Sequence, residues 1–398
     1  MSKSISVIGL GYVGLPLAVA LSEIGFLVNG IDTNLSKIST LKSGISTIED
    51  VSSAKLFELI EGQNLNVSAD FSKIKDSEIV IICVPTPLNG DSQPDYTYIF
   101  EVSESIKKHL SSSTLVILES TVSPGFTRDI FIPKLRGKTN SSNRDLFFAY
   151  SPERIDPANN KWGIKNTPKL VAGEDEVSLK MAVSLYSQIV DHVEECKSLE
   201  IAETAKLLEN SFRLINISFI NEISIFCNKI GIDVREVISA ASTKPYGFMS
   251  FYPSIGAGGH CIPVDPVYLS TKAAELGIKT QMIEVAAKIN HEMPKYFIQR
   301  AKLFLGDLNA KNILVIGLSY KPNVNDMRES HGELLILGLR NNGAQVHWHD
   351  DLVKEWNGER SVALSSKYDL AILATPHDYL DLTKLGNVPI LDTRGSLQ

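Results

Sequence analysis

The chain of 398 residues is 43% hydrophobic and 21% charged, which is typical of a globular protein with room for two or three domains. Its net charge of −7 argues against a nucleic-acid or membrane-surface partner, so an anionic ligand would need local cations. The four cysteines have no CxxC spacing, and no Cys/His cluster has the spacing of a metal site. We therefore expect a reduced, cytoplasmic protein without a metal.

The apolar residues near the N-terminus do not predict a signal peptide. Glycines interrupt them after Ile5, and no cleavage pattern follows. No apolar run in the sequence approaches the roughly 20 residues that a membrane-spanning helix needs. These features agree with a cytoplasmic location.

The N-terminal residues carry a complete dinucleotide-binding unit. Residues 4–9 predict a buried strand, Gly9-Leu10-Gly11-Tyr12-Val13-Gly14 leads into a helix, and a second strand ends at Asp32. Gly9 makes the tight turn, Gly11 lets a pyrophosphate approach the helix N-terminus, and Gly14 allows close helix–strand packing. Asp32 would accept from the ribose 2′-hydroxyl and repel a 2′-phosphate, which favours NAD over NADP. A glycine-rich turn without a nucleotide remains the alternative.

The alternation of strand and helix continues beyond this unit. Three further buried strands are predicted, at residues 78–84, 114–118 and 147–150. Pro85 and Thr86 follow the first of them, Thr121 follows the second, and Glu153 follows the third. Because a doubly wound sheet places its ligands at the carboxyl ends of its strands, we predict that Thr121 and Glu153 face the cofactor side. The alternative is that both are ordinary polar loop residues.

Residues 199–230 predict one helix of about three times the usual length. Glu203, Lys206, Asn210 and Arg213 share one face of this helix. Such a stripe is often only a solvated face, but the remaining positions are apolar and indicate a largely buried helix. A buried polar stripe needs partners or a ligand. The helix would also suit a connection between two domains or the core of a dimer.

Gly258 and Gly259 precede His260 and Cys261, and Asp265 follows behind Pro263. The glycines allow positive φ and close approach of a ligand. Cys261 would then serve as a nucleophile, with Asp265 near enough to handle a proton or a water. Alternatively, the cysteine is a small buried side chain in a tight turn.

After a helix predicted from residue 266 to about 291, the N-terminal pattern starts again. The repeat comprises a strand at 312–317, a helix at 330–341 and strands at 344–349 and 368–374. Gly317 corresponds to Gly9 and Asp350 to Asp32, although the glycine fingerprint is incomplete. Lys321 and Arg328 lie in the loop after the first strand, where they would hold a pyrophosphate. Otherwise they are ordinary surface cations.

The predicted fold is therefore α/β, with two Rossmann-like doubly wound domains joined by a long central helix in an α-helical middle domain. The predicted boundaries are 1–195 for the NAD-binding domain, 196–300 for the helical dimerisation and catalytic domain, and 301–398 for the second Rossmann-like domain.

Together these motifs resemble the UDP-glucose/GDP-mannose dehydrogenase family over essentially the whole chain. The resemblance rests on the dinucleotide unit with Asp32 and on five further segments: Ser120-Thr121-Val122-Ser123-Pro124-Gly125, Ser151-Pro152-Glu153, Ala205-Lys206-Leu207-Leu208-Glu209-Asn210, the block around Cys261, and Tyr320-Lys321-Pro322 through Arg328-Glu329-Ser330. The block from His260 to Pro266 looks like that of the UDP-N-acetylhexosamine branch of this family. The loop 151–159, with Phe251-Tyr252-Pro253, is most similar to UDP-N-acetylglucosamine 6-dehydrogenases. Two departures are Ser254-Ile255-Gly256, where Gly-Pro-Gly is usual, and Ala158, where a glycine is usual.

The resemblance implies an NAD-dependent four-electron oxidation of the C6 hydroxyl of a UDP-N-acetylhexosamine, first of all UDP-N-acetylglucosamine, to the uronic acid. Cys261 would attack the aldehyde to give a thiohemiacetal and then a thioester, which water hydrolyses. Lys206 would stabilise the alkoxide and later oxyanions, and Asn210 would orient the same oxygen. Asp265, Thr121 and Glu153 would position and deprotonate the water.

The resemblance also implies binding residues and partners. The cofactor residues are Gly9, Gly11, Tyr12, Val13, Gly14, Asp32, Lys37, Pro85, Thr86, Thr121 and Arg328. The substrate residues are Glu153, Arg154, Lys206, Asn210, Arg213, Tyr252, Gly258 and Lys321. The expected partners are a UDP-sugar and further copies of the chain, in a homodimer or higher homo-oligomer.

Other functions stay open at this stage. UDP-glucose 6-dehydrogenase and UDP-N-acetylmannosamine dehydrogenase would differ only in the sugar. A one-step hydroxyacid dehydrogenase would need neither Cys261 nor the C-terminal repeat, and a non-enzymatic nucleotide-binding regulator would not need the set of Cys261, Lys206 and Asp265.

Overall fold

An eight-stranded sheet organises the first of two units in the computed structural model, which describes residues 4–48, 50–137, 146–156, 159 and 161–397. The first unit comprises Met1–Leu208 and Val267–Lys272, and the second comprises Glu209–Pro266 and Ala273–Gln398. The helices α7 (Leu199–Ile230) and α9 (Asp265–Glu275) each contribute to both units.

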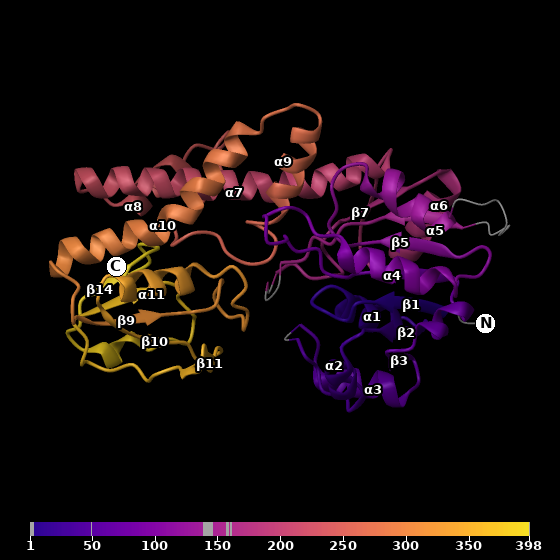
Figure 1. Ribbon diagram of the computed structural model, residues 1–398, viewed down its shortest axis with the longest axis horizontal. Coiled ribbons are helices and arrows are strands. Elements are labelled where there is room, and N and C mark those ends of the chain that lie inside the picture. Colours follow the sequence, from indigo (N-terminus) through magenta and orange to yellow (C-terminus); the bar gives the residue numbers. More distant parts are fainter. Residues whose placement is uncertain (1–3, 49, 138–145, 157–158, 160, 398) are drawn as a thin grey trace. The chain divides into compact units, whose positions relative to one another are not determined.

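The strand order of the first sheet is β3-β2-β1-β4-β5-β6-β7-β8 (Figure 1). The strands are β1 Ser4–Ile8, β2 Leu27–Ile31, β3 Leu65–Ser68, β4 Ile79–Ile82, β5 Leu115–Leu118, β6 Phe147–Tyr150, β7 Lys169–Gly173 and β8 Val193–Glu195. All neighbours are parallel except β6 and β7. The first six strands have the order of a doubly wound dinucleotide-binding sheet, as predicted.

Both faces of this sheet are covered by helices because its strands are apolar on both sides. Val7 and Ile81 point into one core, and the adjacent Ile8 and Ile82 point into the other. The first core packs against α1 (Gly14–Glu23), α2 (Leu35–Lys42), α3 (Ser53–Glu61) and α6 (Glu176–Tyr186). The second packs against α4 (Thr97–Lys107), α5 (Ile132–Arg136) and the start of α7, with the short helices η1 (Phe71–Asp76) and η2 (Thr127–Phe131).

The second unit contains a four-stranded parallel sheet of order β10-β9-β13-β14. Its strands are β9 Asn312–Ile316, β10 Gln345–His349, β13 Leu370–Leu373 and β14 Ile390–Asp392. This order repeats β2-β1-β4-β5 of the first sheet, which confirms the predicted second α/β domain. The unit also contains α8 (Val234–Ser242), α10 (Gln281–Leu305), α11 (His331–Asn341), the hairpin β11–β12 (Glu355–Trp356 and Glu359–Arg360) and η3 (Leu382–Leu385).

Two helices, α10 and α11, cover one face of the second sheet. Phe297 of α10 and Leu335 of α11 join Ile313 and Val315 of β9 in a single core. The alternate β9 residues, among them Leu314, face a smaller core with Leu385 of η3. The alternation along β9 therefore has the same period of two as in β1.

The helix predicted from residue 266 to 291 is in fact two helices. α9 ends at Glu275, and α10 begins only at Gln281. Gly277 adopts φ +75°, and the N–H of Ile278 donates to the carbonyl of Ala273 at 2.9 Å. This is the hydrogen bond of a Schellman motif, which ends a helix at a left-handed glycine.

The long helix α7 has the predicted bounds, and most of its residues are buried or half-buried as expected, but several of its apolar residues are exposed. Leu207 and Leu214 are fully packed, whereas Leu208 and Phe219 are 60% and 57% exposed. Phe212, Phe226 and Ile230 are also exposed. The sequence shows that these positions are apolar, but not whether the same chain covers them.

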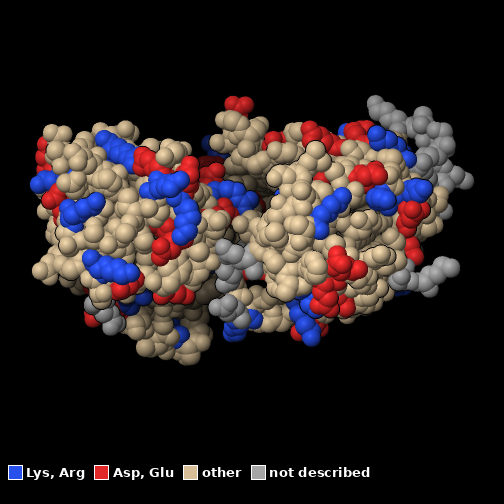
Figure 2. Space-filling model, turned by 90° about the horizontal axis from the view of Figure 1, so that it is seen from below, with Lys and Arg blue, Asp and Glu red and all other residues tan. Residues whose placement is uncertain are grey.

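Charges of both signs are interspersed over the face of the molecule drawn in Figure 2. None of the helices in the described part of the chain combines the length and the apolarity that crossing a membrane requires. On the face drawn in Figure 2, an anionic ligand would meet individual cations rather than a uniformly basic surface.

Candidate active site

The turn between β1 and α1 needs its first and third glycines for different reasons. Gly9 has φ +91°, and a Cβ on it would lie 2.6 Å from the carbonyl oxygen of Cys83. A Cβ on Gly14 would lie 1.9 Å from the carbonyl oxygen of Gly9. The same atom on Gly11 would have no neighbour within 4 Å. The turn is thus closed where helix and strand pack and open at the helix N-terminus, where a phosphate fits.

Asp32 lies at the end of β2 with its side chain only 10% exposed. Its Oδ2 accepts from the backbone N–H of Leu10 at 2.9 Å and from Nζ of Lys37 at 2.8 Å. Tyr12 and Val13 lie in the loop between β1 and α1, and Val13 directly precedes the first turn of α1. An open helix N-terminus beside a fixed carboxylate fits the pyrophosphate and ribose of NAD.

Loops after β4 and β5 carry the next predicted residues, and Tyr268 of α9 ties these loops together. The buried Tyr268 hydroxyl donates to the carbonyl of Thr86 at 2.8 Å and to that of Pro87 at 3.2 Å. Its own carbonyl accepts from Ser123 Oγ at 3.2 Å. The loops of Thr86 and Thr121 are therefore braced by a tyrosine that sequence reasoning missed, because an aromatic residue in a helix resembles any other core residue.

Glu153 follows β6 and meets two residues that the sequence analysis did not select. Nζ of Lys169 lies 3.0 Å from Oε2 of Glu153 and 3.1 Å from Oε2 of Glu119. The only available signals were a charged residue at the start of an apolar strand and an acid at the end of another. The neighbouring Arg154 donates from Nη1 to the carbonyl of Pro168 at 2.7 Å.

The polar stripe of α7 divides into residues with different environments. Glu203 is fully buried and accepts from the backbone N–H of Gly125 at 2.6 Å and of Thr127 at 3.0 Å. Lys206 is buried, Asn210 is half-buried and Arg213 is exposed. Glu203 therefore caps a turn and is not one of the predicted site residues.

In the second unit, Cys261 and Asp265 occupy one turn that ends at the start of α9. The N–H of Asp265 donates to the carbonyl of Cys261 at 2.8 Å. Nδ2 of Asn210 donates to Oδ2 of Asp265 at 2.5 Å. Cys261 is half-buried, and Asp265 is only 2% exposed. The fold thus brings together three of the predicted catalytic residues.

The two glycines before Cys261 are required by close contacts with the loop after β9. A Cβ on Gly258 would lie 2.5 Å from the carbonyl oxygen of Glu329, and one on Gly259 would lie 2.7 Å from the ring of Tyr320. The N–H of Gly259 also donates to the carbonyl of Arg328 at 3.0 Å. The loop that carries Lys321 and Arg328 therefore holds the cysteine loop in place.

The segment that departs from the expected Gly-Pro-Gly is anchored by other means. The N–H of Ser254 donates to Oδ1 of Asn221 at 2.8 Å, and Ser254 Oγ accepts from the N–H of Gly256 at 3.2 Å. Gly256 has φ +128°, and a Cβ there would lie 2.6 Å from the ring of His331. The last glycine is thus indispensable. The other departure, Ala158, lies outside the described residues.

The remaining predicted ligand residues of the second unit are accessible. Lys321 is half-buried, and Tyr252 is 51% exposed with the guanidinium of Arg235 5.0 Å from its ring. Arg328 is exposed, and its Nη2 lies 2.6 Å from Oδ2 of Asp326. Of the predicted catalytic residues, Thr121, Glu153 and Lys206 thus belong to the first unit, and Asn210, Cys261 and Asp265 to the second.

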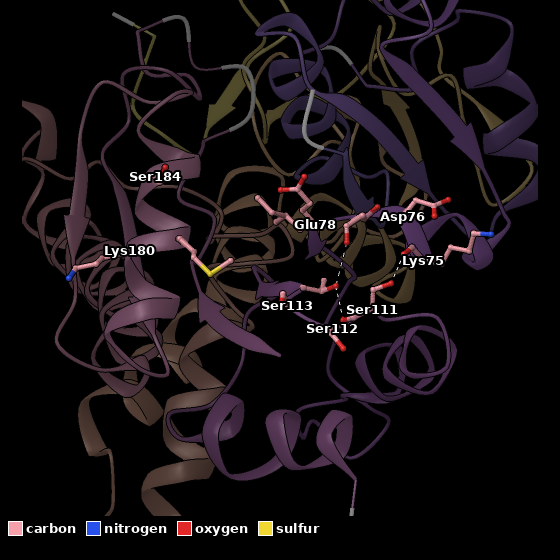
Figure 3. Close-up of a pocket in the computed structure, with 12 residues that line it drawn as sticks. Lys75, Asp76, Glu78, Ser111, Ser112, Ser113, Lys180 and Ser184 are labelled. Atoms are coloured by element: carbon pink, nitrogen blue, oxygen red, sulfur yellow. Dashed lines mark hydrogen bonds between the residues drawn. The ribbon is translucent and has the colours of Figure 1, made fainter. Parts of the chain in front are cut away.

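A cavity of about 590 Å³ lies in the first unit, away from the predicted site residues of that unit. Its lining includes Glu78 and Thr114, which precede β4 and β5, and Lys180 of α6 (Figure 3). It therefore opens at the amino ends of the strands, opposite the edge that ends in Thr121 and Glu153. Within the described ranges, no group of three or more His, Cys, Asp or Glu side chains is arranged to hold a metal ion.

Comparison with known proteins covers nearly all of the chain. Residues 3–190, 200–292 and 314–398 match, in turn, the NAD binding domain, the central domain and the UDP binding domain of the UDP-glucose/GDP-mannose dehydrogenase family. The chain is 34% identical to a UDP-N-acetyl-D-glucosamine 6-dehydrogenase of Pseudomonas aeruginosa, over 94% of this chain and 90% of that protein. It is 32% identical to a UDP-N-acetyl-D-mannosamine dehydrogenase of Methanocaldococcus jannaschii, over 100% and 93%.

Among solved structures, a UDP-D-ManNAc dehydrogenase from Pyrococcus horikoshii superposes with a TM-score of 0.89 at 29% identity, covering 100% of this chain and 96% of that one. The agreement extends from the dinucleotide turn through the cysteine loop to the second sheet. The chain therefore belongs to the UDP-glucose/GDP-mannose dehydrogenase family of NAD-dependent nucleotide-sugar 6-dehydrogenases.

Proposed function

We propose that the chain oxidises the C6 hydroxyl of a UDP-N-acetylhexosamine, first of all UDP-N-acetylglucosamine, to the uronic acid in two steps through Cys261. The observation that carries this proposal is the turn in which Cys261 and Asp265 are hydrogen-bonded and Asn210 contacts the Asp265 carboxylate. A one-step alcohol dehydrogenase would have no use for a cysteine held in this way.

The division of labour follows from the chemistry of each side chain. NAD⁺, when bound, takes up the hydride released at each of the two oxidations. Cys261 Sγ would bond to C6 of the aldehyde while the aldehyde oxygen gains a proton, giving a thiohemiacetal. The next oxidation gives a thioester, and water then attacks C6 and expels the cysteine thiolate. The products are one carboxylate and two NADH for each sugar.

The polar residues would stabilise charge and manage water during these steps. Lys206, a buried cation, would stabilise the alkoxide and the oxyanions, and Asn210 would orient the same oxygen. Thr121, Glu153 and Asp265 would position and deprotonate the attacking water. Exposed Arg213 and Tyr252, with Arg154, Gly258 and Lys321, are proposed for the UDP-sugar.

The choice of sugar rests on similarity rather than on a bound ligand. The relatives that support an N-acetylated sugar are divided between UDP-N-acetylglucosamine and UDP-N-acetylmannosamine enzymes. The loop 151–159, with Phe251-Tyr252-Pro253, favours the former. UDP-N-acetylmannosamine is the second candidate, and UDP-glucose is the third.

The test is the amount of NADH formed per mole of limiting UDP-sugar, with the three sugars in parallel. We expect two NADH from UDP-N-acetylglucosamine with the wild type and a sharp loss of turnover with Cys261→Ser. One NADH with an unaffected mutant would contradict the cysteine mechanism. Turnover of another sugar with two NADH would leave the mechanism intact and change only the substrate.

We further propose that the chain forms a homodimer through α7. Leu208, Phe212, Phe219, Phe226 and Ile230 are exposed and follow spacings of four and seven, so they share one helical stripe. A second copy of the same stripe would cover it. Phe219→Glu should give monomers in analytical ultracentrifugation, whereas Lys229→Glu, on the same helix, should not.

The expected cytoplasmic location and the boundaries of the three predicted domains remain predictions.

A further inference from the structure

Lys169 is the first residue of β7 and lies between two carboxylates. Its Nζ is 3.0 Å from Oε2 of Glu153 and 3.1 Å from Oε2 of Glu119. The side chains of Lys169, Glu153 and Glu119 are 7%, 14% and 0% exposed. A charge with so little access to water depends on its neighbours for stabilisation.

Each carboxylate is also held by donors on its other oxygen. Oε1 of Glu119 accepts from the hydroxyl of Tyr186. Oε1 of Glu153 accepts from the backbone N–H of Arg154 at 2.6 Å and from that of Ile155 at 2.7 Å. Both oxygens of Glu153 therefore have donors, so the plane of its carboxylate is fixed by β7 on one side and by its own loop on the other.

The cluster has an excess of acid, which makes the placement of its one ammonium decisive. Burial raises the pKa of Glu119, and the opposing attraction of Lys169 does not cancel this effect. Burial also raises the pKa of Glu153, but Lys169 and the two backbone donors outweigh it, so the net pKa is lowered. Burial further raises the pKa values of the neighbouring Cys83 thiol and Tyr186 phenol. These two neighbours therefore stay neutral and add no charge.

We propose that Lys169 is a positioning residue that keeps Glu153 ionised and correctly oriented for the step that handles water. Glu119 and Tyr186 fix the ammonium from the opposite side. This inference rests on the catalytic role proposed above for Glu153. A purely structural ion pair would hold the fold together but would leave the pH dependence of turnover unchanged, and this difference separates the two roles.

The experiment compares the pH dependence of kcat for the wild type, Lys169→Met and Lys169→Arg, with UDP-N-acetylglucosamine or, if it is not a substrate, UDP-N-acetylmannosamine. Without the Lys169 ammonium, the pKa of Glu153 would rise, so Glu153 would keep its proton up to a higher pH. We expect the acid limb of the profile to move up by about one unit or more. We also expect kcat at pH 7 to fall about 100-fold, because the carboxylate of Glu153 would lose its orientation. Arginine should restore most of both.

Two further variants keep the test decisive. Lys180→Met removes a lysine from an exposed pair with Glu176 in the same unit, and it should leave the profile unchanged. Glu119→Gln removes the competing carboxylate, so the acid limb should move to lower pH, opposite to Lys169→Met. This opposite shift decides the question if Lys169→Met does not fold, as judged by its circular dichroism.

The outcomes separate the two proposals. If Glu153→Gln retains full turnover, the role proposed for Glu153 is wrong. If Glu153→Gln loses turnover while Lys169→Met and Glu119→Gln keep the wild-type acid limb, the catalytic role stands and the positioning role of Lys169 is overturned.

Discussion

Gly9 and Gly317 both end the first strand of their sheet with positive φ, of 91° and 86°. In each case an added Cβ would strike a backbone carbonyl oxygen just after the strand that pairs with it in the sheet. This oxygen belongs to Cys83 after β4 or to Thr375 after β13. The third glycine also has a counterpart, because a Cβ on Gly14 or Gly332 would point at the carbonyl of Gly9 or Gly317. The two halves are built alike up to the loop between these glycines.

That loop is where the halves differ. Gly14 comes five positions after Gly9 (14 − 9), and Gly332 comes fifteen after Gly317 (332 − 317). The longer loop carries Lys321 and Arg328 and packs against the cysteine loop through Tyr320. One copy thus presents an open helix N-terminus to its ligand, while the other presents side chains.

The acid at the end of the second strand differs as well. Asp32 accepts from Lys37 and keeps some exposure, whereas the side chain of Asp350 is fully buried. Oδ2 of Asp350 accepts from the N–H of Leu318 at 2.8 Å and from Nε2 of His377 at 3.1 Å. Because Nδ1 of His377 accepts from the N–H of Asn323, Nε2 is the ring nitrogen that donates to the carboxylate. Asp350 is therefore committed to shaping its loop and is closed to a ribose hydroxyl.

The sharpest way to break the likeness is to add one methyl group to the third glycine of each half. In Gly14→Ala the Cβ would lie 1.9 Å from a backbone oxygen, so the free energy of unfolding of the first unit should fall by more than about 3 kcal/mol. NAD affinity should be lost as well. In Gly332→Ala the nearest atom is 3.1 Å away, and the gain in helix propensity of about 1 kcal/mol offsets the contact. Hydrogen exchange resolves the two units. Equal losses would contradict the comparison.

A second test exchanges the acids for amides. Asp350→Asn replaces one accepting oxygen by an N–H₂ group, which cannot accept from the donors around it. The free energy of unfolding of the second unit should therefore fall by about 2–3 kcal/mol. Asp32→Asn should instead act mainly on NAD affinity, measured by calorimetric titration. If Asp350→Asn is as stable as the wild type, the buried carboxylate is not what holds the longer loop.

The pH dependence of stability offers a third test, because His331 stands where the first half has Val13. Burial lowers the pKa of His331 to about 4. The unfolded chain binds this proton near pH 6.5 and the folded chain does not, so stability is present above pH 6.5 and falls on acidification toward pH 4. The loss at pH 5 should be about 2 kcal/mol. His331→Val should flatten this slope in denaturant titrations between pH 7 and 5, whatever its stability at pH 7.

The smallest expected effect concerns Lys37, which donates to Asp32 where a histidine, His377, donates to Asp350. Its side chain is 27% exposed, so the ion pair of Lys37 with Asp32 has an interaction free energy of only about 0.2–1 kcal/mol. Lys37→Gln should weaken NAD binding about two- to five-fold and leave folding unchanged. Lys42→Gln, on the same helix, serves as the control. An unchanged dissociation constant would remove Lys37 from the cofactor site.

Sequence periodicity was sufficient to predict the central strands of both sheets and the bounds of α7, because buried strands and helices leave local patterns, but it did not predict β3, β7, β8 and β14. The Gly9 turn was predictable for the same reason, since three glycines, a strand and an acid lie within one short segment. The cysteine turn was also local. Its contact with Asn210 became visible only in the structure.

Long-range contacts account for what the sequence did not predict. Lys169 meets partners 50 and 16 positions away, so no spacing rule selects it. Gly332 escaped notice as the third glycine because the inserted loop separates it from Gly317. The exposure of Leu208 and Phe219 could not be predicted either, because hydropathy does not tell which chain covers an apolar side chain.

The contact between Gly317 and Gly332 has a consequence for loop length. The contact of Gly332 with Gly317 holds the helix to the strand end, while the intervening residues are held by other loops, since the N–H of Asn323 donates to Nδ1 of His377 at 2.9 Å and Tyr320 packs against Gly259. Lengthening such a loop costs little entropy, about 0.6 kcal/mol for each doubling. Exchanging this loop would therefore keep the contact between the two glycines, but it would remove the hydrogen bond to His377 and the packing against the cysteine loop.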